Sequence, residues 1–214
     1  PRQGSVGASG DLAPLAHMAL PLIGEGLVHF QDRIMPAMLA MKEVGLEPLV
    51  LGPKEGISLI NGTQVSTAIG IKACLEAESL LKIADLVGAI SVEASLSSRN
   101  VFKSSIHKLK KHPGQRLVAA NVWNLLRESE IVLSHKDCDR VQDPYSFRCI
   151  PHVHGISRDN YNGAREIVQN EANSVSDNPL IMPNNQIMNS GHFHAESIAQ
   201  AMDNLAIAIA ELGS

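Results

Sequence analysis

The chain has 214 residues, a formal net charge of −4 and 44% hydrophobic residues, the composition of an ordinary globular protein. The slight negative balance argues against nucleic acid or an anionic membrane as a partner. No apolar run approaches the roughly 18 residues of a membrane span and no signal peptide opens the chain, so we expect a cytoplasmic protein.

The three cysteines and the first residue bear on the surroundings of the chain. Cys74, Cys138 and Cys149 form neither a CxxC pair nor a metal-ligand spacing, so we expect free thiols in a reducing compartment. The sequence starts at Pro1 instead of an initiator Met, just before a glycine-rich segment. We therefore expect residues 1–214 to be one segment, the central catalytic part of a longer chain.

The first elements follow from glycine and capping patterns. Glycines at three of the first ten positions predict a loop. Asp11 then begins a predicted helix that continues to about Leu22 and ends near residues 24–26, Gly-Glu-Gly. The loop is therefore expected to lead directly into a helix.

A small hairpin and a short helix are predicted next. Residues 27–35 carry the polar pair Gln31-Asp32 at their centre, which favours a β-hairpin. Pro36 occupies the first position of a predicted helix over residues 36–44, and Gly45 occupies its C-terminal cap.

The strongest helical pattern runs from Thr63 to about Ala89. Four of its polar residues form one narrow stripe at spacings of four and three: Lys72, Glu76, Ser79 and Lys82. Nearly every other position is apolar, so we expect a helix buried on most sides, as the central member of a bundle would be. Glu78 and Lys82 add a favourable pair four residues apart.

Further helices are predicted over residues 115–127, 158–174 and 195–212. The last has apolar residues at spacings of three and four, typical of helices packed side by side: Ala195, Ile198, Met202, Leu205, Ile209 and Leu212. The basic run at residues 107–112 is expected to be a solvated loop. The predicted fold is all-α, mainly a bundle of long helices, with one small β-hairpin and functional loops.

The segment with the most chemical information is residues 4–15, which read GSVGASGDLAPL. By itself, Ala-Ser-Gly before Asp11 could be a flexible turn that ends in a helix cap. The complete segment resembles the signature of the aromatic amino acid ammonia-lyases and aminomutases. The resemblance extends over essentially all 214 residues.

This resemblance implies that the chain makes its own prosthetic group. In the family, the amide nitrogen of the residue matching Gly10 attacks the carbonyl carbon of the residue matching Ala8, and water leaves. The residue matching Ser9 then loses its hydroxyl, which produces a 4-methylidene-imidazol-5-one, an electron-poor alkene. A glycine suits the attacking position because a Cβ would crowd the compressed backbone. The resemblance implies no metal and no other cofactor.

Two further segments match family motifs. Residues 59–64, LINGTQ, contain Asn61, which could cap the long helix. The resemblance instead places Asn61 at the ring and the substrate amine. Residues 134–149 read SHKDCDRVQDPYSFRC and include Arg148, whose planar guanidinium suits a bidentate grip on a carboxylate. Without the motif, a surface ion pair would be favoured for Arg148.

The resemblance assigns roles to three more side chains. It implies that Arg148 holds the substrate carboxylate, and that Tyr145 and Gln142 orient the substrate and the prosthetic group. In residues 190–196, SGHFHAE, it implies that Phe193 packs beside the ring. This motif departs from the family at two positions, because His192 replaces a usual Asn and Ser197 a usual Pro.

A metal site is the main rival interpretation. Residues 152–154 and 192–194 are both His-x-His pairs, a pattern that can bind metal in a strand. No acidic or cysteine partner at a supporting spacing is evident, so we predict no metal.

The resemblance finally implies an activity. Residues 134–136 and 144–146 resemble the branch that eliminates ammonia from L-histidine to give trans-urocanate. A tyrosine or phenylalanine lyase or aminomutase is the alternative within the family, and a non-catalytic helical interaction module is the alternative outside it. Family members are homotetramers with shared active sites, and their tyrosine base and acidic ring partner have no match here. We therefore expect residues 1–214 to be inactive on their own.

Overall fold

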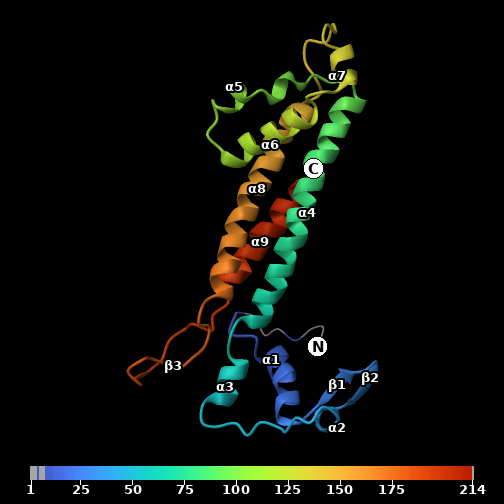
Figure 1. The fold of residues 1–214 in the computed structure, drawn as a ribbon. Coiled ribbons are helices and arrows are strands. Elements are labelled where there is room, and N and C mark those ends of the chain that lie inside the picture. The colour runs from blue at the N-terminus through green and yellow to red at the C-terminus, as the bar shows by residue number, and fades with distance from the viewer. Residues whose placement is uncertain (1–3, 5–7, 214) are drawn as a thin grey trace. The chain divides into compact units, whose positions relative to one another are not determined.

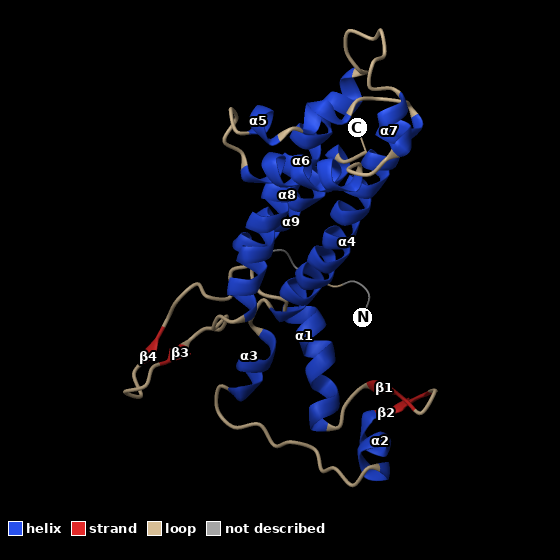
Figure 2. Cartoon of the chain, turned by 45° about the horizontal axis from the view of Figure 1, so that its top comes forward, coloured by secondary structure: helices blue, strands red, loops and turns tan. Residues whose placement is uncertain are grey.

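The computed structural model describes residue 4 and residues 8–213, so Ser5, Val6 and Gly7 of the predicted N-terminal loop lie outside the described residues. The chain divides into two compact units. The first contains residues 1–70 and 167–200, and the second contains residues 71–166 and 201–214. The predicted helical fold is confirmed, and the strands of the described residues form two short hairpins (Figure 2). Within the described residues, no helix is long and apolar enough to cross a membrane.

The helix predicted after the N-terminal loop ends earlier than expected. Helix α1 covers Leu12–Ala19, and the chain then tightens into the 3-10 helix η1, Leu20–Ile23. Pro21 lies in the first turn of η1, where its missing N–H cannot continue the α-helical pattern. Gly24 ends the element with a φ of +81°, in the left-handed region that glycine adopts without strain.

The predicted hairpin is confirmed (Figure 1). Strands β1 (Leu27–Phe30) and β2 (Arg33–Pro36) are antiparallel, with Phe30 opposite Arg33. Gln31 and Asp32 both have positive φ, which matches the twist of a two-residue hairpin turn. Helix α2 follows as Ala37–Glu43. Pro36 is its N-cap and not its first residue, because Pro36 still pairs with β1.

The first unit also contains a short helix and a second hairpin. Helix α3 (Glu55–Ile60) packs beside α1. Strands β3 (Leu180–Ile181) and β4 (Ile187–Met188) form a second hairpin, which the sequence analysis did not predict.

The long helix α4 covers Gln64–Ala94 and extends five residues beyond the predicted end at Ala89. Glu78 and Lys82 form the expected ion pair at 2.8 Å. The expected burial on most sides is wrong for this chain alone. Many apolar side chains of α4 are exposed: Ile69, Ile71, Leu75, Leu80, Ile83, Leu86, Val87 and Ile90.

Helix α8 corrects the largest error in the predicted boundaries. It covers Tyr145–Ala172, whereas the expected helix began only at Arg158. Pro151 and Gly155 lower the helix propensity of the missed half, but both lie inside the helix. A Cβ on Gly155 would lie 2.4 Å from the backbone nitrogen of Gln115, so glycine permits close packing against α6 (Pro113–Leu125).

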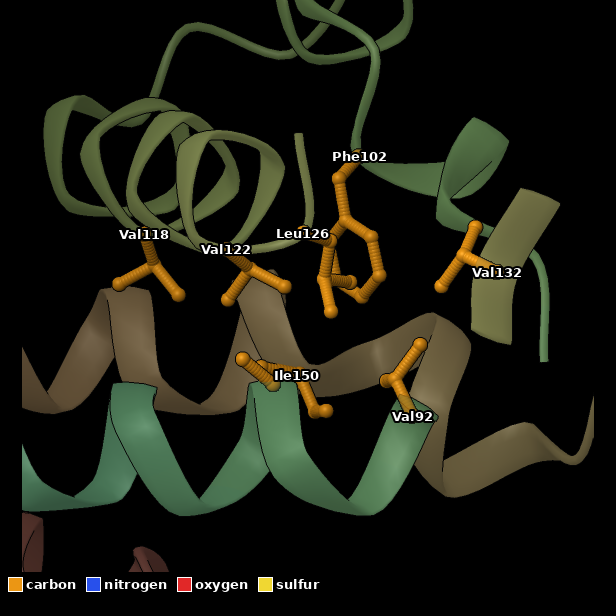
Figure 3. Close-up of a cluster of buried hydrophobic side chains, with 8 residues drawn as sticks. Val92, Phe102, Val118, Val122, Leu126, Val132 and Ile150 are labelled. Carbon is orange, nitrogen blue, oxygen red and sulfur yellow. The ribbon is translucent and has the colours of Figure 1, made fainter. Parts of the chain in front are cut away.

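Short elements complete the second unit around one apolar core. Helix η2 is Arg99–Phe102, α5 is Ser104–His107 and α7 is Glu130–Ser134. Figure 3 shows the buried core side chains pointing toward one another from several of these helices. The core comprises Ala89, Val92, Phe102, Val118, Val122, Leu126, Val132 and Ile150.

Two further expectations need correction. The basic run is not entirely solvated, because His107 is buried and its ring is hydrogen-bonded to Gln115 and to the Val101 carbonyl. Helix α9 is Glu196–Glu211, close to the predicted range. Ala201 and Ala208 are its buried residues where Met202 and Ile209 were expected. The buried face is therefore rotated by one residue at these two turns.

Candidate functional site

The proposed ring-forming residues lie in a loop of the first unit whose backbone suits glycine at position 10. Gly10 is buried and has a φ of +88°. A Cβ at this position would lie 2.9 Å from the side-chain oxygen of Asn61. A residue with a Cβ would be unfavourable here, because it would strain the left-handed backbone and collide with Asn61. Ser9 is exposed and Ala8 is half-buried.

Asp11 fixes the C-terminal side of this loop. Its backbone N–H donates to the carbonyl of Gly62 at 2.7 Å. Its carboxylate is almost fully buried and accepts hydrogen bonds from the backbone N–H and the hydroxyl of Ser66, in the first turn of α4. In the alternative interpretation of this turn Asp11 would cap the helix, but its side chain makes no capping hydrogen bond to α1. It satisfies an otherwise unpaired N–H at the start of α4 instead.

The N-terminal side of the loop is held by the segment that contains Phe193. The backbone N–H of Ala195 donates to the carbonyl oxygen of Ala8 at 3.0 Å. Ala195 is buried and Phe193 is half-buried. An N–H that donates to this oxygen polarises the carbonyl group, which makes its carbon more open to attack by a nucleophile.

Asn61 lies against Gly10 because of the turn between α3 and α4. It is the C-cap of α3, and its own N–H donates to the carbonyl of Ile57. The alternative that Asn61 caps the long helix is wrong, since α4 begins three residues later at Gln64. Its amide side chain is therefore available to the loop.

Three predicted site residues belong to the second unit: Tyr145 and Arg148 lie in the first turn of α8, and Gln142 lies just before the helix. Tyr145 and Arg148 are one helical turn apart in α8. Arg148 is half-buried, and its Nε donates to the carbonyl of Asp143 at 2.9 Å. Asp143 is itself held by the backbone N–H of Ser98 at 2.9 Å. Gln142 is exposed.

Tyr145 lines a pocket of about 540 Å³ in the second unit. Cys149 and His154 of α8 also line this pocket, together with Val87 and Gly88 of α4.

The first unit brings Ala8, Ser9, Gly10 and Asn61 together. Phe193 is two residues from Ala195, whose N–H contacts Ala8.

A buried polar network in the second unit was missed by the sequence analysis. Asp85 of α4 is 3% exposed and accepts hydrogen bonds from His154 at 3.1 Å, Arg158 at 2.8 Å and Asn121 at 2.8 Å. Arg158 also donates to the carbonyl of Leu81. Sequence spacing could not reveal the network, because its partners are 36 to 73 residues apart.

The structure gives no support to a metal site at the His-x-His pair of residues 152–154. Residues 152–154 lie on a helix and not in a strand, so side chains two residues apart do not share a face. His154 is hydrogen-bonded to Asp85, whereas the ring of His152 lies 5.8 Å from that of His107. His192 is hydrogen-bonded through Nδ1 to Ser190, two residues earlier in a loop.

Comparison with known proteins identifies the family of this chain. Residues 1–214 match the family described as aromatic amino acid lyase. Proteins named histidine ammonia-lyase from Myxococcus xanthus and Vibrio cholerae are 49% and 50% identical over the whole chain. The chain spans 42% of the length of each.

Solved structures show the same fold. Histidine ammonia-lyase from Trypanosoma cruzi superposes with a TM-score of 0.87 at 39% identity, over the whole chain and 39% of its own length. Tyrosine aminomutase from Streptomyces globisporus gives a TM-score of 0.89 at 37% identity, over the whole chain and 44% of its own length. The chain belongs to the aromatic amino acid lyase family.

Proposed function

We propose that the protein containing this chain eliminates ammonia from L-histidine to give trans-urocanate. The observation that carries the proposal is the loop at Ala8–Gly10, with Gly10 in a left-handed conformation against Asn61. This loop belongs to a chain about half identical to proteins named histidine ammonia-lyase. Among the solved structures the difference is small, with 39% identity to the histidine ammonia-lyase and 37% to the tyrosine aminomutase.

The residues present fit the self-formed 4-methylidene-imidazol-5-one of the family. Gly10 lacks the Cβ that would collide with Asn61, and the Ala195 N–H polarises the carbonyl of Ala8. Ser9 supplies a hydroxyl that can be eliminated. Once formed, the group would supply an electron-poor alkene that captures the substrate amine and makes it a leaving group.

The other site residues would bind and orient the substrate. Arg148 suits the carboxylate of an α-amino acid, because its guanidinium can donate two parallel hydrogen bonds. Asn61 would hydrogen-bond near the ring and the amine, and Phe193 would pack beside the ring. Tyr145 and Gln142 would orient the substrate. We infer no metal.

The whole assembly is also a proposal. We infer that residues 1–214 are the central part of a longer lyase chain, a cytoplasmic homotetramer with shared active sites. The exposed apolar side chains of α4 support this, because apolar faces of this kind favour burial against other helices. Sedimentation of the full-length protein as a monomer would contradict the inference.

The activity is tested with the full-length protein and three substrates. We expect ammonia release from L-histidine, with urocanate as product, and slower or no release from L-tyrosine and L-phenylalanine. Preference for either of these would move the protein to the alternative branch. A non-catalytic helical module would release no ammonia, and its intact mass would show no loss of water from residues 8–10.

Replacing Arg148 with lysine is expected to reduce kcat/KM for histidine while leaving the prosthetic group formed. Lysine keeps the charge but loses the planar fork, so the carboxylate should be held loosely. Loss of position relative to an electrophile can cost on the order of a hundredfold in rate. Steady-state kinetics measure the fall, and intact mass measures the loss of two waters.

Arg165→Lys is the matched control, since Arg165 is an exposed arginine on the same helix. It should retain wild-type kinetics. An unchanged kcat/KM in Arg148→Lys would remove Arg148 from the site and leave it a structural side chain at the start of α8.

A further inference from the structure

The backbone at Lys54 is strained in a way that its side chain explains. Lys54 is the N-cap of α3, and its φ of +71° lies in the left-handed region that a residue with a Cβ rarely adopts. Such conformations persist only where the surrounding structure holds them. The contacts of the Lys54 side chain therefore show what holds its backbone in this left-handed conformation.

Lys54 is part of a partly buried polar cluster. Its ammonium group is ion-paired with the carboxylate of Asp177, and the two side chains are only 20% and 19% exposed. Ser58, one turn along α3, accepts a hydrogen bond from Lys54 at 2.8 Å and donates to Asp177 at 3.1 Å. These three side chains tie the start of α3 to a segment more than a hundred residues away in the sequence.

Asp177 is suited to this contact at neutral pH. Burial tends to raise the pKa of its carboxyl, but hydrogen bonds from Lys54, the backbone N–H of Asn178 and Ser58 together hold that pKa below its usual value. Its second oxygen accepts the Asn178 N–H at 2.6 Å. The side chain of Asn178 in turn accepts the N–H of Ser190 at 2.6 Å. The cluster is thus continuous with the segment that leads to Phe193.

A second tie joins the same two segments beyond Asn61. The hydroxyl of Thr63, which is almost fully buried, donates to Glu171 at 2.6 Å, and Gln64 donates to Ser176 at 3.3 Å. A Cβ on Gly62 would lie 2.6 Å from the carbonyl oxygen of Ser176. Asn61 therefore lies between two attachments to residues 171–177, one at each end of its turn.

From this arrangement we infer that Lys54, Ser58 and Asp177 form a positioning clamp that sets Asn61 against the backbone of Gly10. Helix α3 transmits the constraint, because the Lys54 carbonyl accepts the N–H of Ser58 and the Ile57 carbonyl accepts that of Asn61. The clamp rests on the proposed function in one respect: Asn61 and Gly10 must belong to the site. Lys54 and Asp177 are then positioning residues that touch neither substrate nor ring.

The clamp is tested in the full-length protein with Lys54→Met, which keeps the aliphatic stem and removes the charge. We expect a smaller fraction of chains to have lost two waters, measured by intact mass. We also expect kcat per mature site to fall about tenfold with a smaller change in KM, because displacement of an orienting group by a fraction of an ångström lowers rate before affinity. Lys54→Arg should recover most of both.

A double mutant shows whether the effect passes through Asn61. In an Asn61→Ala background, adding Lys54→Met should cause little further loss, because two residues acting through one path are not additive. An equal loss in both backgrounds would overturn the clamp and make Lys54 an ordinary stabilising residue. So would a wild-type water loss and kcat in Lys54→Met.

Controls separate the clamp from folding and from the proposed function. Arg33→Met removes an exposed ion pair with Glu43 in the same unit and should change neither measurement. If Lys54→Met does not fold, Asp177→Asn and Ser58→Ala test the same cluster with smaller changes, and wild-type values in both would contradict it. If histidine is not the substrate, the intact-mass measurement still tests the clamp, whereas the activity of the wild type tests the function.

Discussion

Replacing Ser9 with alanine in the full-length protein is expected to abolish ammonia release. Alanine has no β-hydroxyl to eliminate, so the electron-poor alkene cannot form, and no side chain of the standard set is a comparable electrophile. We expect a loss of at least about a thousandfold in kcat, since the chemical step loses its covalent catalyst. Intact mass should show that the loss of two waters, present in the wild type, has disappeared.

Ser197→Ala is the matched control for Ser9→Ala. Ser197 is an exposed serine of α9 with no assigned role in the site, so its hydroxyl should be dispensable. The two variants should have the same circular dichroism and oligomeric state. Wild-type activity in Ser9→Ala would refute the electrophile and, with it, the proposed reaction.

Replacing Asp85 with alanine is expected to cause the largest loss of stability in the second unit. The carboxylate is 3% exposed and pairs with Arg158 at 2.8 Å, so its removal leaves a largely buried guanidinium without its counter-ion. Breaking one partner of a buried pair costs about 3–5 kcal/mol. His154 and Asn121 would lose an acceptor as well. The shift of the urea midpoint in the full-length protein measures the effect.

A second variant tests whether unpaired charge is the cause. Asp85→Ala combined with Arg158→Met should recover part of the loss, because the cation that would remain buried is removed together with its partner. Glu76→Ala is the exposed control on the same helix, where the pair with Lys72 is 3.6 Å long and contributes little. If the double variant loses the sum of the two single losses, charge burial does not explain the destabilisation.

The sequence alone was enough to predict the ring chemistry and much of the helical pattern. The motif around Ala8, Ser9 and Gly10 can be recognised because the proposed chemistry needs particular residue types in consecutive positions. It can therefore be identified without knowledge of the fold. The hairpin at residues 27–36 and the helix from residue 64 follow from local turn residues and from apolar periodicity. These features depend on neighbours within a few residues.

The tertiary structure decided what depends on distant residues. From the residues alone Asn61 could be a helix cap, and the family resemblance assigned it to the ring. The fold places its side-chain oxygen next to Gly10. The early start of α8 was missed because Pro151 disfavours a helix locally, whereas packing against α6 outweighs that propensity.

The strained backbone of Lys54 and its pairing with Asp177 left no local signal, because the two residues are 123 positions apart. Asp85 likewise appears in sequence as a charged interruption of an apolar helix, and its three hydrogen-bond partners come from two other helices. Residue patterns within a short stretch of sequence predict backbone conformation and the proposed ring chemistry. The positioning of side chains around that chemistry requires contacts between segments that only the folded chain brings together.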